Sequence, residues 1–164
     1  MTWSIGRISK RHDRVSFDCG DASLNEYLSK YARQNDEKGI TRTWVAVRPG
    51  ETRVMGYVSL RTGHVEFTDL PMDERRKLPR YPVPVVHIAR LAVDRDAQGQ
   101  GLGGCLLVRA LRIARAVSEE IGVRAVEVIA TTRAAREFYR RFGFQGLPRD
   151  ELHLYLGMKV VKSG

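Results

Sequence analysis

Four glycines gather in a six-residue stretch of the chain: Gly99, Gly101, Gly103 and Gly104. They follow an apolar, β-branched run over 85–93 and lead into a segment with helical spacing. Glycine lets a backbone approach its partner closely, because no side chain is in the way. N–H groups at a helix start attract an anion, since they lack intrahelical acceptors and the helix dipole is positive there. The pattern predicts an anion-binding turn around which the chemistry of the protein is organised.

Two common kinds of glycine-rich phosphate loop fit this turn poorly. The loop of many nucleotide hydrolases ends in Gly-Lys-Ser or Gly-Lys-Thr, and no such tripeptide occurs in the chain. Glycines at 99, 101 and 104 do form the G-x-G-x-x-G of dinucleotide folds. However, the five residues 94–98 separate the first glycine from the strand, where that fold uses a tight turn. The strands expected after the turn are also too few for a doubly wound sheet.

The length and composition of the chain limit the possible classes of protein. With 164 residues, 43% of them hydrophobic, the chain can bury one core, and we expect a single domain over residues 1–164. It has neither an apolar stretch long enough to span a membrane nor a signal-peptide pattern, which predicts a soluble, cytoplasmic protein without membrane association. Cys19 and Cys105 are single and far apart, which argues against a disulfide framework.

The charge of the chain favours a polyanionic partner. A formal net charge of +9 and a pI near 10.0 indicate nucleic acid before membrane. The alternative is an ordinary basic enzyme whose charges only keep it in solution, because charge alone carries no base-reading information.

Periodicity and turn residues predict a mixed α/β (α+β) fold. An antiparallel hairpin comes first and a β-α-β-α-β half follows, around a mixed central sheet. Ser23 and Glu26 have capping-box spacing at the first helix, and Gly39, Gly122 and Gly143 are expected to end the three longer helices. The expected elements are a strand and turn over 5–17, a helix from 21 to 38, strands over 43–47 and 53–60 with 62–67 extending the second or starting another, a short helix at 72–78 inside a proline-rich loop at 68–84, a strand at 85–93, a helix at about 103–121, a strand at 123–130, a helix at 132–142 and a strand at 152–156.

Two motifs in this order resemble the GNAT N-acetyltransferase superfamily. The turn Q98-G-Q-G-L-G103 matches the acyl-coenzyme A loop pattern Arg/Gln-x-x-Gly-x-Gly/Ala, and E137-F-Y-R-R-F-G-F144 is similar to the later F-Y-x-x-x-G-F segment. The strand end L91-A-V-D also resembles the family's splayed strand. The similarity covers residues from about 43 to 158 and implies the GNAT fold, with acetyl-CoA as the acyl donor.

A closer resemblance covers nearly the whole chain. F17-D-C-G-D-A-S-L-N-E-Y-L, A32-R-Q-N and G39-I-T-R-T-W-V look like the N-terminal half of the GNAT toxins of toxin–antitoxin modules. This resemblance implies a dimeric toxin that acetylates the α-amino group of aminoacyl-tRNA, blocks translation and pairs with a ribbon-helix-helix antitoxin. The alternatives are acetylation of a protein N-terminus or small amine, and a non-catalytic module that binds acyl-CoA or nucleic acid.

The resemblance also implies roles for individual residues. The backbone from Gln98 to Gly103 would hold the pyrophosphate of acetyl-CoA, and Leu91 and Val93 would pair with its pantetheine arm. The expected donor-binding residues are Leu91, Ala92, Val93, Gln98, Gly99, Gln100, Gly101, Leu102, Gly103 and Gly104.

Tyr139 is the expected catalytic residue, because the tyrosine of F-Y-x-x-x-G-F lies near the thioester sulfur in the family. A phenol keeps its proton at neutral pH and can pass it to the departing thiolate. Glu127 and His87 are candidates for a general base, although each also fits a structural role. An α-amine titrates near 8 and a lysine amine near 10.4, so an α-amine needs less help from a base.

Basic residues outside these motifs are candidates for phosphate contacts, and each also fits a solvated charge. They are Arg33, Lys38, Arg42, Arg76, Lys77, Arg80 and Arg90. The four histidines show no metal-ligand spacing, and we expect no metal.

Overall fold

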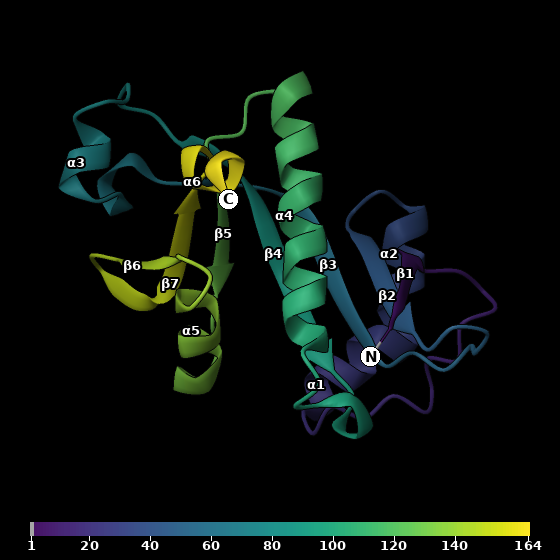
Figure 1. The fold of residues 1–164 in the computed structure, drawn as a ribbon. Helices are drawn as coiled ribbons and strands as arrows, with labels where there is room; N and C mark the ends of the chain where they lie inside the picture. The colour runs from purple at the N-terminus through teal and green to yellow at the C-terminus, as the bar shows by residue number, and fades with distance from the viewer. Residues whose placement is uncertain (1) are drawn as a thin grey trace. The chain divides into compact units, whose positions relative to one another are not determined.

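Seven strands form one mixed sheet in the order β1-β2-β3-β4-β5-β7-β6 (Figure 1). The computed structural model describes residues 2–164. The pairs β1–β2, β2–β3, β5–β7 and β6–β7 are antiparallel, whereas β4 and β5 run parallel. This mixed sheet with an N-terminal hairpin confirms the predicted fold class. The chain divides into two compact units, and each is described by itself.

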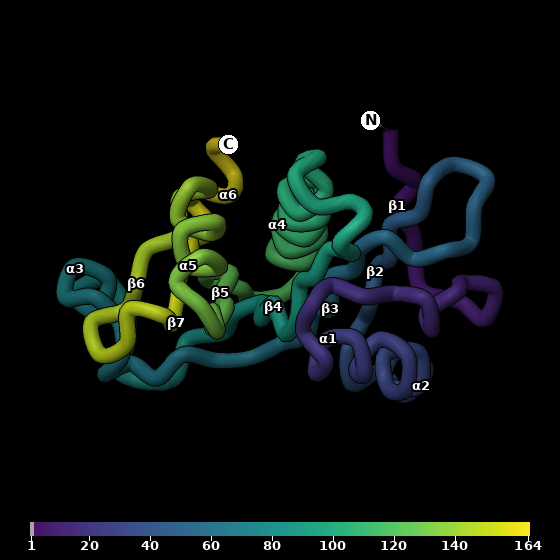
Figure 2. Tube along the Cα trace, turned by 90° about the horizontal axis from the view of Figure 1, so that it is seen from below, coloured from purple at the N-terminus to yellow at the C-terminus, as the bar shows by residue number. Residues whose placement is uncertain are grey.

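The first unit comprises the chain up to Arg61 together with Ala89–Ala110. Its elements are β1 (Ser4–Arg7), α1 (Ala22–Glu26), a π-helical turn (Tyr27–Tyr31), α2 (Ala32–Glu37), β2 (Arg42–Val47), the first part of β3 (Gly56–Val65), the end of β4 (Val83–Val93), a 3-10 turn (Arg95–Ala97) and the start of α4 (Leu102–Glu120). Within this unit, α1 and α2 lie on one face of the sheet and the start of α4 on the other (Figure 2).

Aromatic residues fill the core beneath α1 and α2. Tyr57 of β3 is fully buried and stacks against Tyr27 with ring centroids 6.5 Å apart. The Tyr57 hydroxyl donates to the Leu24 carbonyl at 2.8 Å, and the Tyr27 hydroxyl lies 3.0 Å from Thr41 Oγ1. These hydrogen bonds satisfy two phenols that would otherwise be costly to bury.

The second unit comprises Thr62–Ile88 and Leu111–Gly164. Besides its parts of β3, β4 and α4, it contains a 3-10 turn (Phe67–Asp69), α3 (Met72–Arg75), β5 (Ala125–Ile129), α5 (Arg133–Arg140), β6 (Gln145–Leu147), β7 (Asp150–Gly157) and α6 (Met158–Ser163). Its core includes Val65, Val85, Ala125 and Tyr155, which come from β3, β4, β5 and β7.

The structure corrects several sequence-based expectations. Asp21, not Ser23, caps α1: its side chain accepts from the N–H groups of Ser23 and Leu24 at 2.9 and 3.3 Å. The predicted helix from 21 to 38 contains the π-helical turn, which its pattern did not indicate. The strand and turn expected over 5–17 reduce to the short β1. Both β6 and α6 were missed, while β3 does extend to Val65.

Positive backbone angles explain two of the expected helix ends. Gly39 has φ +73° after α2, and Gly143 has φ +100° after α5. Residues with a Cβ rarely adopt this backbone region, so glycine is favoured where a helix ends in this way.

Among the described residues, no helix combines the length and apolar character that crossing a membrane requires.

Gly56 is the glycine of β3 that lets the start of α4 approach the sheet. A Cβ at this position would lie 2.9 Å from Leu106 Cδ1, 3.0 Å from Leu102 Cδ2 and 3.3 Å from the Ala92 carbonyl oxygen. Both leucines are fully buried, so their side chains cannot turn outward into solvent to avoid the added methyl group.

Replacing Gly56 by alanine is therefore expected to destabilise the fold by about 1–3 kcal/mol, the usual cost of overpacking. Urea unfolding followed by circular dichroism measures this loss. Gly6→Ala is the matched control, because a Cβ at Gly6 meets nothing within 4 Å. Equal stability of the two variants would contradict the close approach.

Candidate active site

The glycine turn predicted from sequence joins β4 to α4 within the first unit. β4 ends at Val93, the 3-10 turn covers Arg95–Ala97, and α4 begins at Leu102. Gly99 and Gly101 have φ +77° and +81°, while a Cβ on either would meet nothing within 4 Å. These two positions therefore require glycine for their backbone angles and not for lack of space.

The two glutamines of the turn hydrogen-bond to its own backbone. Gln98 Nε2 donates to the Val93 carbonyl at 2.9 Å, and Gln100 Nε2 donates to the Asp96 carbonyl at 3.1 Å. These side chains therefore stabilise the loop, and the groups that remain to bind a ligand are the backbone N–H groups. The first N–H groups of any α-helix lack intrahelical acceptors, which gives the start of α4 its affinity for anions.

Asp94 anchors this turn from below. Its side chain is 1% exposed and accepts from the N–H of Asp18 at 2.9 Å and of Asp96 at 2.8 Å. Arg53 Nη2 lies 3.1 Å from both carboxylate oxygens of Asp94. Four hydrogen bonds thus satisfy a buried charge, which would be strongly unfavourable if unpaired. No local sequence pattern indicated its contacts with Arg53 and Asp18, since these partners lie 41 and 76 positions away.

All ten residues predicted to bind the acyl donor lie on one continuous run of this unit. Leu91, Ala92 and Val93 end β4, Gln98–Gly101 form the exposed loop, and Leu102–Gly104 begin α4. Ala92 is 6% exposed and belongs to the core cluster that contains Tyr27 and Tyr57.

Tyr139, the predicted catalytic residue, lies on α5 in the second unit. Thr132 caps this helix by accepting from the Ala135 N–H at 3.0 Å. Tyr139 is 5% exposed and packs edge-on against Phe138 and Phe144, with ring centroids 5.1 and 5.4 Å away. Burial raises the pKa of Tyr139, so its hydroxyl is protonated at neutral pH and available as a donor.

Both residues considered as general bases lie in the second unit and touch each other. His87 of β4 and Glu127 of β5 are a registered pair, and His87 Nδ1 lies 2.6 Å from Glu127 Oε1. His153 of β7 joins them, with Nε2 at 2.5 Å from Glu127 Oε2. No local pattern groups His153 with the other two, because cross-strand register decides which residues meet.

The basic residues predicted to contact phosphates differ in whether they already have a partner within the fold. In the first unit, Arg33 pairs with Glu37 at 2.7 Å, and Arg42 donates to the Asp36 carbonyl. The Arg90 guanidinium stacks over the Tyr27 ring at 3.6 Å from its centroid. The remaining candidates are exposed: Lys38 after α2, and Arg76, Lys77 and Arg80 around α3.

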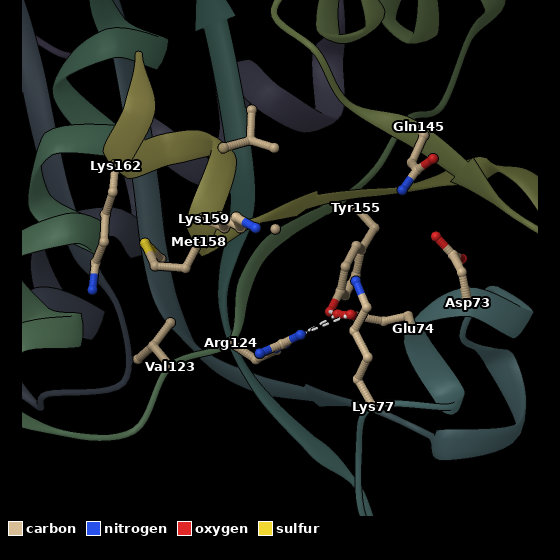
Figure 3. Close-up of a pocket in the computed structure, with 12 residues that line it drawn as sticks. Asp73, Glu74, Lys77, Val123, Arg124, Gln145, Tyr155, Met158, Lys159 and Lys162 are labelled. Atoms are coloured by element: carbon tan, nitrogen blue, oxygen red, sulfur yellow. Dashed lines mark hydrogen bonds and ion pairs between the residues drawn. The ribbon is translucent and has the colours of Figure 1, made fainter.

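A hollow of about 540 Å³ lies between α3, β7 and α6 of the second unit (Figure 3). On its wall, Arg124 Nη2 lies 2.8 Å from Glu74 Oε1, and the Tyr155 hydroxyl donates to Glu74 Oε2 at 2.5 Å. The Arg124 hydrogen bonds hold the pKa of Glu74 below its usual value, so this pair is ionised and mutually neutralised. The exposed lysines Lys77, Lys159 and Lys162 leave the hollow with an excess of positive charge.

A second hollow, of about 420 Å³, lies next to α3 and combines aromatic and basic residues. Phe67, Arg75, Arg80 and Tyr81 are among those that line it, and Tyr81 is 63% exposed. Aromatic rings and guanidinium groups are the surfaces on which unstacked bases pack.

Among residues 2–164, no group of three or more His, Cys, Asp or Glu side chains is arranged to hold a metal ion.

The acetyltransferase (GNAT) domain matches residues 39–146, which include the glycine turn and Tyr139. The chain belongs to the GNAT acetyltransferase family. The predicted superfamily is thereby confirmed, and the GNAT fold with it.

Individual GNAT relatives match almost the entire chain. The chain is 44% identical to the "tRNA-acetylating toxin" of Mycobacterium tuberculosis, covering 96% of this chain and 93% of that protein. It is 29% identical to AtaT in the solved structure "AtaT complexed with acetyl-methionyl-tRNAfMet", with a TM-score of 0.92 and coverage of 99% and 98%. A Tyr→Phe variant of AtaT, bound to the C-terminus of the antitoxin AtaR and to acetyl-CoA, is 27% identical, with a TM-score of 0.83 and coverage of 98% and 96%.

The anchoring of the glycine turn by Asp94 can be tested through two neighbouring aspartates. Asp94→Asn places an amide N–H₂ among hydrogen-bond donors and is expected to lower the free energy of unfolding by about 2–4 kcal/mol, because a buried pair is broken while Arg53 stays partly hydrated. Asp96 also pairs with Arg53, at 3.1 Å, but is 65% exposed. Asp96→Asn should cost no more than about 0.5 kcal/mol. Thermal unfolding of both variants gives the comparison, and equal losses would refute the role of Asp94.

Proposed function

We propose that this protein is an acetyl-CoA-dependent N-acetyltransferase toxin that acetylates the α-amino group of aminoacyl-tRNA and so inhibits translation. The observation that carries the proposal is the glycine turn between β4 and α4, in a chain that matches tRNA-acetylating relatives over nearly its full length. The proposal assigns residues 1–164 to one acetyltransferase domain, acting in the cytoplasm, where charged tRNA is found.

The donor site in this proposal is the run from Leu91 to Gly104. Backbone N–H groups of the loop and of the first turn of α4 bind the pyrophosphate of acetyl-CoA, because the loop backbone is exposed and the helix dipole favours negative charge. Leu91, Ala92 and Val93 extend alongside the pantetheine arm as a neighbouring strand would. The acetyl-CoA bound to AtaT supports this choice of donor.

Acetyl transfer requires a nucleophilic amine and a protonated leaving group. The lone pair of the α-amino nitrogen attacks the thioester carbonyl carbon, the C–S bond breaks, and the nitrogen loses one proton while the sulfur gains one. We assign Tyr139 as the donor of the proton to sulfur. Its burial keeps the hydroxyl protonated and excludes water, which strengthens a hydrogen bond to the developing thiolate.

The tRNA-binding surface in this proposal is formed by seven basic residues: Arg33, Lys38, Arg42, Arg76, Lys77, Arg80 and Arg90. Among them, the exposed cations around α3 are the best placed to meet phosphates. Lys77 lines the hollow that is rich in lysine, and Arg80 lines the one that combines arginine with aromatic rings. A net charge of +9 supports the same assignment.

The proposed partners follow from the solved AtaT complexes. AtaT binds the antitoxin AtaR, and we propose that a ribbon-helix-helix antitoxin binds this chain in the same role. We further propose that the toxin is a homodimer without a bound metal.

Substrate and catalytic residue are tested in one assay. The protein is incubated with labelled acetyl-CoA and total charged tRNA, followed by RNase digestion. Wild-type protein is expected to place label in N-acetyl-aminoacyl-adenosine. Tyr139→Phe is expected to lower kcat at least about 100-fold, the usual scale of a general acid, with acetyl-CoA affinity within about twofold. The Tyr→Phe variant of AtaT retains the fold, which supports phenylalanine as a folded substitution.

Tyr31→Phe serves as the control for this assay, because Tyr31 is 48% exposed and lies in the first unit. Label in protein N-termini or small amines would replace the proposed substrate. No transfer at all would support a binding module. Full activity of Tyr139→Phe would refute only the role of the tyrosine.

The RNA surface is tested by the salt dependence of binding to uncharged tRNA. Replacing Arg76, Lys77 and Arg80 together by glutamine should reduce the slope of log Kd against log salt by about 2, because each lost phosphate contact removes about 0.7–0.9. The control removes three other exposed arginines of the same unit, Arg112, Arg115 and Arg133, and should leave the slope within about 0.5. Equal slopes for the two triple variants would refute the assignment.

A further inference from the structure

The second unit contains a carboxylate held between two histidines on three adjacent strands. His87, Glu127 and His153 project from β4, β5 and β7, and register places His87 opposite Glu127. The Glu127 oxygens lie 2.6 Å from His87 Nδ1 and 2.5 Å from His153 Nε2. Each imidazole therefore has its own carboxylate oxygen, and one ring nitrogen of each remains for another partner.

The protonation of this cluster follows from what each group can do. Burial alone would raise the pKa of Glu127, but the hydrogen bonds from His87 and His153 outweigh it and hold the pKa below its usual value. An ionised carboxylate only accepts hydrogen bonds, so His87 Nδ1 and His153 Nε2 must both carry hydrogen. In neutral rings, the lone pairs are then at His87 Nε2 and His153 Nδ1. The carboxylate fixes both tautomers.

The Glu127 side chain is less exposed to solvent than the two imidazole rings that bind it. The Glu127 side chain is 8% exposed, whereas those of His87 and His153 are 14% and 20% exposed. Gly63 on the neighbouring β3 lets His87 and Glu127 pack closely against that strand, since a Cβ there would lie 3.3 Å from His87 Cβ and 3.6 Å from Glu127 Oε1. A buried carboxylate that orients a partly exposed imidazole resembles the arrangement by which acyl-transfer enzymes hold a histidine base.

His87 is also the histidine whose strand carries the proposed donor residues. The registered pairs of β4 with β5 run from Val85–Ala125 to Ile88–Val128, so His87 and Glu127 form the last pair but one. β4 continues beyond this ladder to Val93, through Leu91 and Ala92. His153 lies on β7, opposite Ile129, and serves as the second donor to Glu127.

We propose that His87, held by Glu127 and His153, accepts the proton that the substrate amine loses during acetyl transfer. The inference rests on the proposed function and completes its proton balance. The new N–C bond forms as the amine nitrogen attacks, its proton passes to His87 Nε2, and Tyr139 gives a proton to the departing sulfur. Exchange with solvent then returns the imidazolium and the phenolate to their starting forms. Glu127 and His153 are positioning residues, because both act through His87.

Asparagine at position 87 tests this role, because its amide N–H₂ can keep the hydrogen bond to Glu127 while no nitrogen base remains. His87→Asn is expected to lower kcat for charged tRNA about 100-fold, with the KM for acetyl-CoA within about twofold and the melting temperature near that of wild type. Glu127→Gln should lower kcat about 10-fold with the same KM, since the amide can no longer accept from both rings. His64→Asn, at an exposed histidine paired with Glu66, is the control and should keep wild-type kcat.

Chemical rescue separates a base from a structural residue. Added imidazole should restore turnover of His87→Ala, and more basic substituted imidazoles should restore it further. Wild-type kcat in His87→Asn, absence of rescue in His87→Ala, or rescue of His153→Ala in its place would each overturn the proposal. If wild-type protein itself transfers no acetyl group to charged tRNA, the proposed function fails and this inference fails with it; if only the variants behave otherwise than expected, the inference alone fails.

Discussion

The buried carboxylate of Asp94 fixes the place where β4 stops being a strand. Its backbone N–H still bonds across the sheet to the Met55 carbonyl at 2.8 Å, while its side chain already organises the turn that follows. Arg53 and the Asp18 N–H approach it from distant parts of the same unit. Because a buried charge is tolerated only where donors surround it, the position of the loop is tied to several segments at once. The start of the glycine turn is therefore held in position, although the glycines allow its backbone to bend.

The same physical device recurs in the second unit with a different outcome. Asp94 accepts only from groups that stay protonated, namely backbone N–H groups and a guanidinium, so it serves as a fixed anchor. Glu127 accepts from two imidazoles, each of which has a second ring nitrogen that can take up a proton. A buried carboxylate therefore stabilises geometry in one unit and prepares proton transfer in the other. The chemical nature of its donors makes the difference.

Local patterns in the sequence predicted what depends on local physics. The glycine turn, the strand before it, the long helix after it and the Gly143 helix end all follow from nearby residues, and the structure has them. The Asp94–Arg53 pair and the Glu127 cluster could not be predicted, because their members lie 26 to 41 positions apart and meet only through strand register. The predicted cap of the first helix, Ser23, was wrong. Aspartate and serine are both good capping residues, and backbone geometry decides that Asp21 caps α1.

Net charge is an incomplete guide to a nucleic-acid surface, and the candidate arginines show why. Arg33 and Arg42 lie against acidic or carbonyl oxygens, and Arg90 lies against an aromatic face, so part of their charge already stabilises the fold. A phosphate must compete with these partners, whereas Arg76, Lys77 and Arg80 are exposed around a short helix. Counterion release rewards the second kind of cation more, because nothing internal is given up. The exposed cations in the connection between β3 and β4 are thus better suited to bind phosphates than the arginines that already have partners within the fold.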